Sequence, residues 1–171
     1  PFAYICHLES SELGASSHVS IWERQSIKSL EILIDTIADP AKLCVENIES
    51  QAPSLMDHIT DLLPVSHCID IGHFWKMGLD PMLYMQRWLP RTRVIHLHGF
   101  EGSDHKSLSI VNFTKLDPVV EIVNKHFRGV VTLEVFNEKD FLDSVESFWN
   151  SLERSMRQTA LARRISVGPT L

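Results

Sequence analysis

The sequence predicts an α/β fold of the (β/α) barrel, or TIM-barrel, type, in which parallel strands alternate with helices. Three observations support this prediction. Strand-like and helix-like segments alternate five times along 171 residues, which is typical of parallel strands joined by crossover helices. The glycine-rich turn that usually follows the first strand of an open doubly wound sheet is absent. Every predicted strand ends in a polar residue. This is typical of a barrel whose functional site lies at the carboxyl ends of its strands.

Short apolar runs predict the strands, and apolar residues at helical spacing predict the helices. Strands are expected at 2–8, 42–48, 65–71, 93–98 and 130–136. Helices are expected at 19–38, 53–63, 81–89, 116–127 and 138–156. Asp80 with Pro81, and Asn137, mark two helix starts. The segments 72–79 and 99–112 are expected to be loops.

The predicted domain is a partial barrel at 1–156, and residues 157–171 are expected to form a C-terminal tail. A complete barrel has eight units in about 250 residues, so five units predict that the N-terminal strands are missing. The apolar face of the last helix is expected to pack, with Trp149 also in a packed position. It carries Phe141, Val145, Phe148 and Leu152. His67 is expected at the surface.

Composition and charge exclude several classes of protein. The chain is 44% hydrophobic with a net charge of −6, and it lacks the long apolar run of a membrane span and the basic stripe of a nucleic-acid binder. Three cysteines without disulfide-like spacing predict free thiols in a reducing compartment, the cytoplasm. We expect a small-molecule substrate, no membrane and no nucleic-acid partner, and homo-oligomerisation stays open.

Each predicted strand ends, or nearly ends, in a side chain that can bind a metal ion. These residues are His7, Glu46, Asp70, His96 and Glu134. Side chains alternate along a strand, so the residue two positions earlier faces the same way. In four strands that residue is small, as expected for the layer below a site: Cys44, Cys68, Val94 and Thr132. His73 and His105 are expected on loops at the same end, with His98 one layer beyond His96.

Oxygen and nitrogen ligands of this kind favour Zn or Mn, with Fe or Co as alternatives, over a cysteine-rich structural zinc. One ion needs about four protein ligands, and the set available is Glu46, Asp70, His96 and Glu134. The remaining histidines are His7, His73 and His105. They either bind a second and a third ion, as in two-metal phosphoester hydrolysis, or contact the substrate. We therefore expect one to three divalent ions.

The motifs around these residues resemble the xylose isomerase-like TIM-barrel superfamily, which includes endonuclease IV and many sugar epimerases. The matching pieces occur in the family's order and cover most of the chain. They are Leu43-Cys-Val-Glu46-Asn47, Cys68-Ile-Asp70-Ile-Gly-His73, Val94-Ile-His96-Leu-His98, Asp104-His105-Lys-Ser-Leu108 and Thr132-Leu-Glu134. The family's first strands, which carry another metal-binding histidine in the nuclease branch, have no match in this sequence.

The resemblance implies a different ligand set in each branch. The nuclease branch implies a three-metal cluster held by His7, Glu46, Asp70, His73, His96, His105 and Glu134. The epimerase branch implies one Mn or similar ion held by Glu46, Asp70, His96 and Glu134. There the two glutamates also move the proton, and His73 contacts the substrate. The nuclease branch has an aspartate two residues before its loop histidine, whereas this sequence has Ser103 at that place and Asp104 next to it.

Two pieces, His96-Leu-His98-Gly and Asp104-His105-Lys-Ser-Leu108, are also similar to a hydrolase subgroup that remodels cobamides. The surplus histidines favour a divalent-metal-dependent hydrolase that cleaves a phosphoester with a metal-activated water. The acidic net charge favours a small molecule, nucleotide-like or corrinoid, over DNA as its substrate. The alternative is a metal-dependent sugar isomerase or epimerase that uses Glu46 and Glu134 as acid and base. The catalytic candidates are Glu46, Glu134 and His73. The candidates for substrate binding are His98, Asp104, Lys106 and Trp75.

Overall fold

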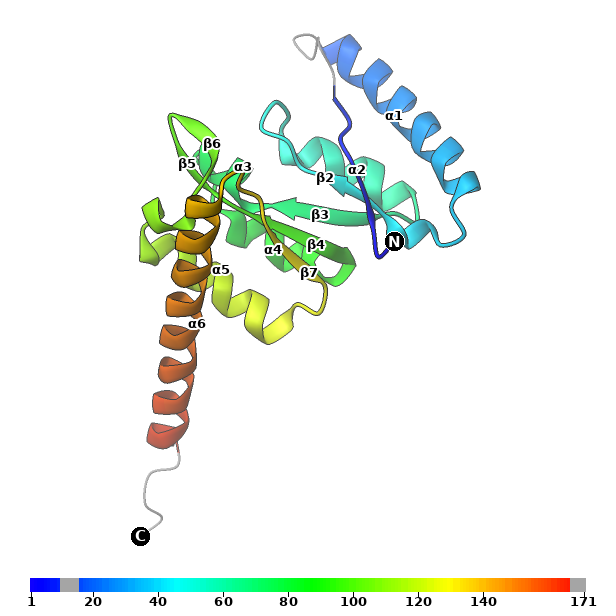
Figure 1. Ribbon diagram of the computed structural model, residues 1–171. Coiled ribbons are helices and arrows are strands. Elements are labelled where there is room, and N and C mark those ends of the chain that lie inside the picture. Colours follow the sequence, from blue (N-terminus) through cyan, green and yellow to red (C-terminus); the bar gives the residue numbers. More distant parts are fainter. Residues whose placement is uncertain (10–15, 167–171) are drawn as a thin grey trace. The chain divides into compact units, whose positions relative to one another are not determined.

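The computed structural model describes residues 1–9 and 16–166, with side chains for 1–9 and 19–158 (Figure 1). The chain divides into two compact units. Unit 1 comprises Pro1–His96 and Gly129–Thr132, and unit 2 comprises Leu97–Arg128 and Leu133–Leu171. No helix in the described part of the chain combines the length and the apolar character that a membrane span requires.

Unit 1 is built on a five-stranded sheet with the order β1-β2-β3-β4-β7. The strands are β1 (Tyr4–Cys6), β2 (Leu43–Glu46), β3 (Ser66–Asp70), β4 (Thr92–Leu97) and β7 (Val130–Leu133). Strands β1 to β4 pair in parallel, with Glu46 opposite Cys68 and Asp70 opposite His96. These strands follow one another in sequence order, as in a (β/α) barrel and unlike a doubly wound sheet. The predicted fold class, a partial barrel, is confirmed.

The helices of unit 1 are α1 (Ser16–Thr36), α2 (Pro53–Leu62), α3 (Ile71–Lys76) and α4 (Pro81–Trp88). The predicted start of α4 is confirmed, because the Asp80 carboxylate accepts the Met82 N–H at 2.9 Å and Pro81 is the first helical residue. The expectation of a loop after β3 is wrong. The Asp70 carboxylate accepts the His73 N–H at 2.8 Å and so caps α3, because an aspartate at this position satisfies a free helical donor.

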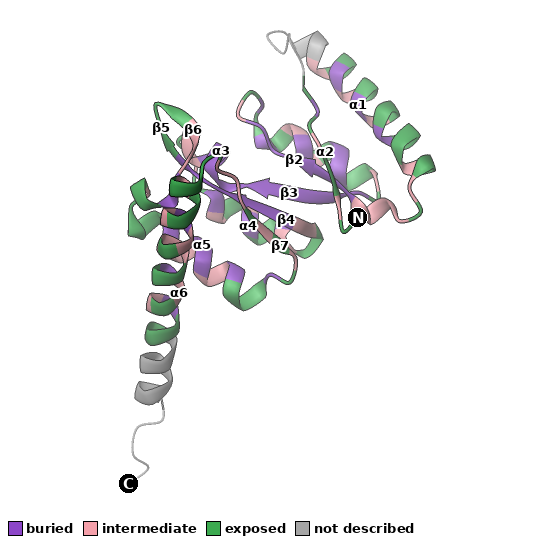
Figure 2. Cartoon of the chain, in the orientation of Figure 1, coloured by how far each residue is buried: buried purple, intermediate pink, exposed green. Residues whose placement is uncertain are grey.

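The core of unit 1 lies on both faces of β2 and β3, which are buried along their whole length (Figure 2). On the helix side, Leu43 and Val45 belong to a cluster with Leu30, Met56 and Ile59. On the opposite side, Cys44, Cys68 and Val94 pack together. Three of the four small residues predicted below the site therefore form one layer.

Unit 2 holds a hairpin and two long helices. Its elements are β5 (Gly99–Glu101), β6 (Ser103–Lys106), the 3-10 helix η3 (Leu108–Ile110), α5 (Phe113–His126) and α6 (Glu138–Ser166). The segment expected to be a loop thus contains an antiparallel strand pair. Its turn needs Gly102, whose φ is +69° and lies in the left-handed region that favours glycine. At Gly99 a Cβ would collide with the Ser107 carbonyl oxygen.

The two helices of unit 2 differ from the predicted ranges at one end each. Helix α5 begins earlier than predicted, because the Asn112 side chain accepts the Thr114 N–H at 2.9 Å and caps it. Asn137 caps α6 as predicted, since its Oδ1 accepts the Asp140 N–H at 2.8 Å. Helix α6 was expected to end near Met156 but continues to Ser166. Of the predicted tail, 167–171 lies outside the described residues.

Helix α6 packs on α5 and on η3, and small and polar residues of α6 lie at these contacts. Ser144, Ser151 and Ser155 are buried. Both Arg154 and Ser151 donate hydrogen bonds to Asp117, the guanidinium at 2.6 and 2.8 Å and the hydroxyl at 2.7 Å. The hydrogen bonds from Arg154 hold the pKa of Asp117 below its usual range, although partial burial raises it. The expected packing of the apolar face is therefore wrong in part, since Phe141 and Trp149 are 47% and 58% exposed.

His67 is buried, so the expectation that it lies at the surface is wrong. Its ring stacks on Trp88, with centroids 4.8 Å apart and planes 6° from parallel. Burial lowers the pKa of His67 from 6.5 to about 4. The positive charges of Arg91 and Arg87 act in the same direction and Asp61 opposes them. The imidazole is therefore neutral in the folded protein at pH 7.

We expect the free energy of unfolding to fall as the pH falls from about 6.5 to about 4, because the unfolded chain then binds a proton that folded His67 does not. The lowered pKa corresponds to a loss of about 3 kcal/mol of unfolding free energy over this pH range. H67F keeps the ring stack and removes the titrating group. Urea unfolding at a series of pH values should therefore show a flatter profile for H67F than for the wild type. Identical profiles would contradict this assignment.

Candidate metal centre

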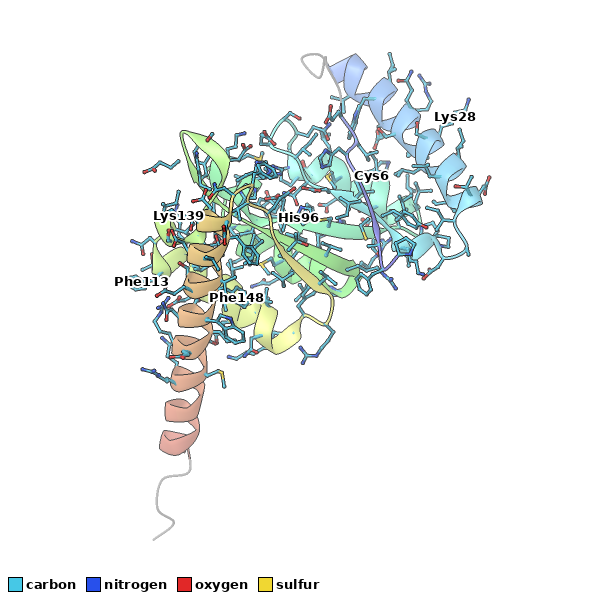
Figure 3. The ribbon with its side chains drawn as sticks, viewed as in Figure 1. Cys6, Lys28, His96, Phe113, Lys139 and Phe148 are labelled. Atoms are coloured by element: carbon cyan, nitrogen blue, oxygen red, sulfur yellow. The ribbon has the colours of Figure 1, made fainter. Side chains whose placement is uncertain are left out.

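Three buried side chains meet at the carboxyl ends of neighbouring strands of unit 1. Glu46 is the last residue of β2, Asp70 is the last of β3, and His96 is the second-last of β4. One ligand atom from each lies within 4.8 Å of the others, and Figure 3 labels His96 in this region. The parallel register, which sets Asp70 opposite His96, explains why separate strands deliver these residues to one place.

Glu46 is the centre of this cluster. Its Oε1 lies 3.2 Å from Nδ1 of His96, and its Oε2 lies 3.1 Å from Nε2 of His7, which follows β1. Burial raises the pKa of Glu46, but the hydrogen bonds and charges of His96 and His7 outweigh burial and leave the pKa below its usual range. Glu46 is therefore ionised, as a metal ligand or a general base must be.

Asp70 brings a second buried carboxylate to the cluster. Its Oδ1 caps α3, and its Oδ2 lies 3.9 Å from Nδ1 of His96 and 3.6 Å from Nδ1 of His73. Two buried carboxylates are costly unless positive charge compensates them. A divalent cation supplies that charge, and two carboxylates with one imidazole are donors that Zn and Mn accept. The residues present therefore fit a divalent ion.

Asn47, which the sequence analysis did not include in the site, contacts both Asp70 and His73. The side chain of Asn47 donates to the Asp70 carbonyl oxygen at 2.9 Å and accepts the Asp70 N–H at 2.8 Å. The carbonyl oxygen of Asn47 lies 2.8 Å from Nδ1 of His73. Its position directly after Glu46 was the available signal, because loop residues at strand ends share the site. Asn47 therefore fixes the backbone of Asp70 and the ring of His73.

We expect N47D to weaken metal binding about 10- to 100-fold, the usual effect of removing an outer hydrogen-bond partner of a ligand. Aspartate has the same shape but lacks the amide donor to the Asp70 carbonyl. Calorimetric titration with Mn²⁺ measures the affinity, and circular dichroism checks the fold. N150D, at an exposed position of α6, is the matched control. Equal affinities for N47D and wild type would show that Asn47 does not position the site.

Glu49 is a second residue that sequence reasoning missed. Its Oε1 accepts from Lys76 at 2.7 Å, and its Oε2 lies 3.4 Å from Nε2 of His73. Partial burial raises the pKa of Glu49, but the hydrogen bond from Lys76 and further interactions, including the charge of His73, lower it below its usual range. Both ring nitrogens of His73 thus face oxygen atoms of the protein. His73 lies on α3, and not on the predicted loop.

Cys68 lies close enough to Glu46 and His96 to be considered as a metal ligand with them. Burial raises the pKa of its thiol to about 12, although a hydrogen bond with His96 acts in the opposite direction. The nucleophilic and metal-binding form of cysteine is the thiolate. The protonated thiol therefore favours a site of oxygen and nitrogen ligands, as the sequence predicts.

Unit 2 carries a second cluster, centred on His105. Nδ1 of His105 lies 3.2 Å from Asp104, and Nε2 lies 3.7 Å from Glu134. The ring stacks on His98, with centroids 4.5 Å apart. The backbone of His105 has a φ of 55°, which is uncommon for a residue other than glycine, and its N–H donates to Nδ1 of His98 at 3.0 Å. A rare backbone conformation at such a cluster is typical of functional sites.

The structure thus brings the predicted residues together in two groups. The group in unit 1 is His7, Glu46, Asp70, His73 and His96. The group in unit 2 is His98, Asp104, His105 and Glu134. Trp75 is half-buried on α3, and Lys106 is half-buried on β6. The functional roles assigned to all these residues stay predictions.

A comparison with solved structures identifies a similar fold. The chain superposes on a protein described as "D-tagatose 3-epimerase-like protein" with a TM-score of 0.75 and 19% sequence identity. The match covers 91% of this chain and 63% of that one, so this chain spans less than two thirds of its length. No family model matches the sequence, and no curated protein matches it. The chain therefore shares the fold of this structure over most of its own length, and the predicted (β/α) barrel type agrees with it.

Proposed function

We propose that the protein is a metal-dependent sugar isomerase or epimerase, the alternative of the sequence analysis, and not the phosphoester hydrolase expected first. The observation that carries this proposal is the buried cluster of Glu46, Asp70 and His96 at the strand ends of a partial barrel. The similar structure, described as D-tagatose 3-epimerase-like, supports epimerisation better than hydrolysis. The three cysteines are free thiols, which supports the cytoplasm as its compartment.

Glu46, Asp70 and His96 would hold one divalent ion, Mn or Zn, with Glu134 as the fourth ligand predicted from the sequence. The bound ion would polarise the carbonyl group of the sugar and its neighbouring hydroxyl group. Glu46, kept ionised by His7 and His96, would then accept the proton from the carbon next to the carbonyl. Glu134 would return a proton to that carbon, and the surrounding buried side chains would exclude water.

The contacts of His73 are compatible with a site that holds one ion. Its Nδ1 lies 2.8 Å from the carbonyl oxygen of Asn47, and its Nε2 lies 3.4 Å from Glu49. Nδ1 is held by the carbonyl oxygen, so His73 would contact a substrate through Nε2, on the side that faces Glu49. This arrangement suits the substrate contact that the epimerase alternative assigns to His73.

Hydrogen exchange tests the proposal directly. The full chain, loaded with Mn²⁺, is incubated in D₂O with a panel of ketohexoses and ketopentoses. We expect one ion per chain by elemental analysis, and deuterium at the carbon next to the carbonyl by NMR. Cleavage of bis(p-nitrophenyl) phosphate with two or three ions per chain would favour the hydrolase instead. A folded protein that binds no ion would contradict both functions.

A further inference from the structure

Cys68 lies one layer below Asp70 on β3, at the candidate metal centre. Side chains two positions apart in a strand point the same way, so the thiol and the carboxylate share the face of the sheet that carries the centre. The register sets Cys68 opposite Glu46 on β2. On the other side of β3, it sets Asp70 opposite His96. Glu46 and His96 therefore have two alternative partners on β3.

The distances allow two overlapping sets of metal ligands. One atom each of Glu46, Cys68 and His96 lies within 4.8 Å of the others, and the same holds when Asp70 takes the place of Cys68. Donor atoms in a tetrahedral zinc site are about 3.3–3.6 Å apart, because zinc binds nitrogen, oxygen and sulfur at about 2.0–2.3 Å. Oε1 of Glu46 lies 3.2 Å from Nδ1 of His96, and Cys68 forms a hydrogen bond with His96. Small side-chain rotations therefore complete the set that contains the thiol.

The two sets favour different kinds of ion. Carboxylate and imidazole ligands suit Mn²⁺, whereas thiolate ligands select softer ions such as Zn²⁺ and its heavier analogue Cd²⁺. When the sulfur of Cys68 binds an ion, the thiol releases its proton to the solvent, because the thiolate is the form that binds metals. Asp70 then stays outside the set and continues to cap α3 through Oδ1. The softness of the ion thus decides between Cys68 and Asp70.

We propose that thiophilic divalent ions, Zn²⁺ or Cd²⁺, bind Glu46, Cys68 and His96, one layer deeper than the position with Asp70 that Mn²⁺ takes. The deeper site rests on the metal centre of the proposed function, because it shares Glu46 and His96 with it. For the same reason the two positions are never filled together. A soft ion displaces Mn²⁺ and occupies the carboxylate that would accept the proton from the sugar. Mn²⁺ is then the working ion, and Zn²⁺ is an inhibitor.

Absorption spectroscopy tests the thiolate ligand without any turnover. The metal-free full chain is titrated with Cd²⁺, and the ultraviolet charge-transfer band of a cadmium–thiolate bond is recorded. We expect the band to saturate at one Cd²⁺ per chain in the wild type and to be lost in C68S. C44S is the matched control, because Cys44 packs on Cys68 in the same layer but belongs to none of the candidate ligand groups among the described side chains. C6S controls for the half-buried thiol of Cys6, and both controls should keep the band.

Ion affinities separate the two positions. C68S should weaken Cd²⁺ binding at least about 10-fold and change Mn²⁺ binding less than about threefold, whereas D70N should do the reverse. Asparagine at position 70 still accepts the His73 N–H, so α3 keeps its cap. The Mn²⁺-loaded wild type should release one Mn²⁺ for each Cd²⁺ that binds, which electron paramagnetic resonance measures. Circular dichroism shows that each variant is folded.

The outcomes distinguish this proposal from the proposed function. A folded wild type that binds Cd²⁺ without the band, a band that C68S retains, or Cd²⁺ binding without release of Mn²⁺ would overturn the deeper site. In each of these cases, binding of Mn²⁺ would still support the metal centre. A folded protein that binds neither ion would overturn both the deeper site and the proposed function.

Discussion

The E46Q variant is expected to lose turnover by a factor of about 10² to 10⁴, the usual contribution of a general acid or base. Glutamine has the shape of glutamate but carries no charge. It therefore cannot accept a proton from a carbon, and it offers a weaker ligand to a divalent ion. Exchange of deuterium into the ketose measures turnover, and calorimetric titration with Mn²⁺ measures ion affinity.

E46Q should keep the fold, because the amide can still accept a hydrogen bond from His96 or from His7. E31Q is the matched control, since Glu31 is exposed on α1, and its turnover should equal that of the wild type. Deuterium exchange at the wild-type rate in E46Q would show that Glu46 is not a catalytic residue. A loss of near-ultraviolet dichroism in E46Q would instead assign Glu46 a structural role.

The F74A variant is expected to lose about 3–5 kcal/mol of unfolding free energy, as when a buried aromatic ring is truncated in a close-packed core. Phe74 is fully buried and stacks on Tyr84, with centroids 4.6 Å apart. A tilted contact with Trp88, at 6.0 Å, completes its surroundings. Urea unfolding measures the loss.

L83A is the control for F74A, because Leu83 lies exposed on α4 and surface substitutions usually stay within about 0.5 kcal/mol. F74A should also weaken Mn²⁺ binding in the protein that remains folded, since Phe74 anchors the short helix that begins after Asp70 and carries His73. A loss of unfolding free energy below about 1 kcal/mol in F74A would mean that the neighbouring rings fill the cavity left by Phe74.

The strand ends could be predicted from the sequence because they depend on local pattern alone. Alternation along 42–48 fixes Glu46 on the face of Cys44, and the run before Asp70 fixes Asp70 in the same way. Parallel strands joined by helices then bring their carboxyl ends to one edge. The contacts of Asn47 and Glu49 could not be predicted so easily, because they join loops and turns whose paths depend on the folded chain.

Other features depend on partners that are distant in the sequence. His67 is buried because Trp88, on α4, covers its ring, and no local pattern signals this contact. The hairpin of β5 and β6 was missed because 103–106 is polar and lacks the β-branched residues that predict strands. Its formation depends on the positive φ of Gly102 and on the absence of a side chain at Gly99. The anchoring of α6 on α5 was missed because it depends on hydrogen bonds from Ser151 and Arg154 to Asp117, and polar residues carry no apolar pattern.

The two oxygen atoms of Asp70 have separate tasks, and this separation bears on how the apoprotein behaves. Oδ1 holds the start of α3 by accepting the His73 N–H, while Oδ2 lies 3.9 Å from Nδ1 of His96 and 3.6 Å from Nδ1 of His73. The cap therefore forms without an ion, unlike in zinc fingers, where removal of the metal unfolds the domain. Treatment with a chelator should leave a folded protein that can be reloaded with different metals. The ion can then be identified by exchange in a single preparation.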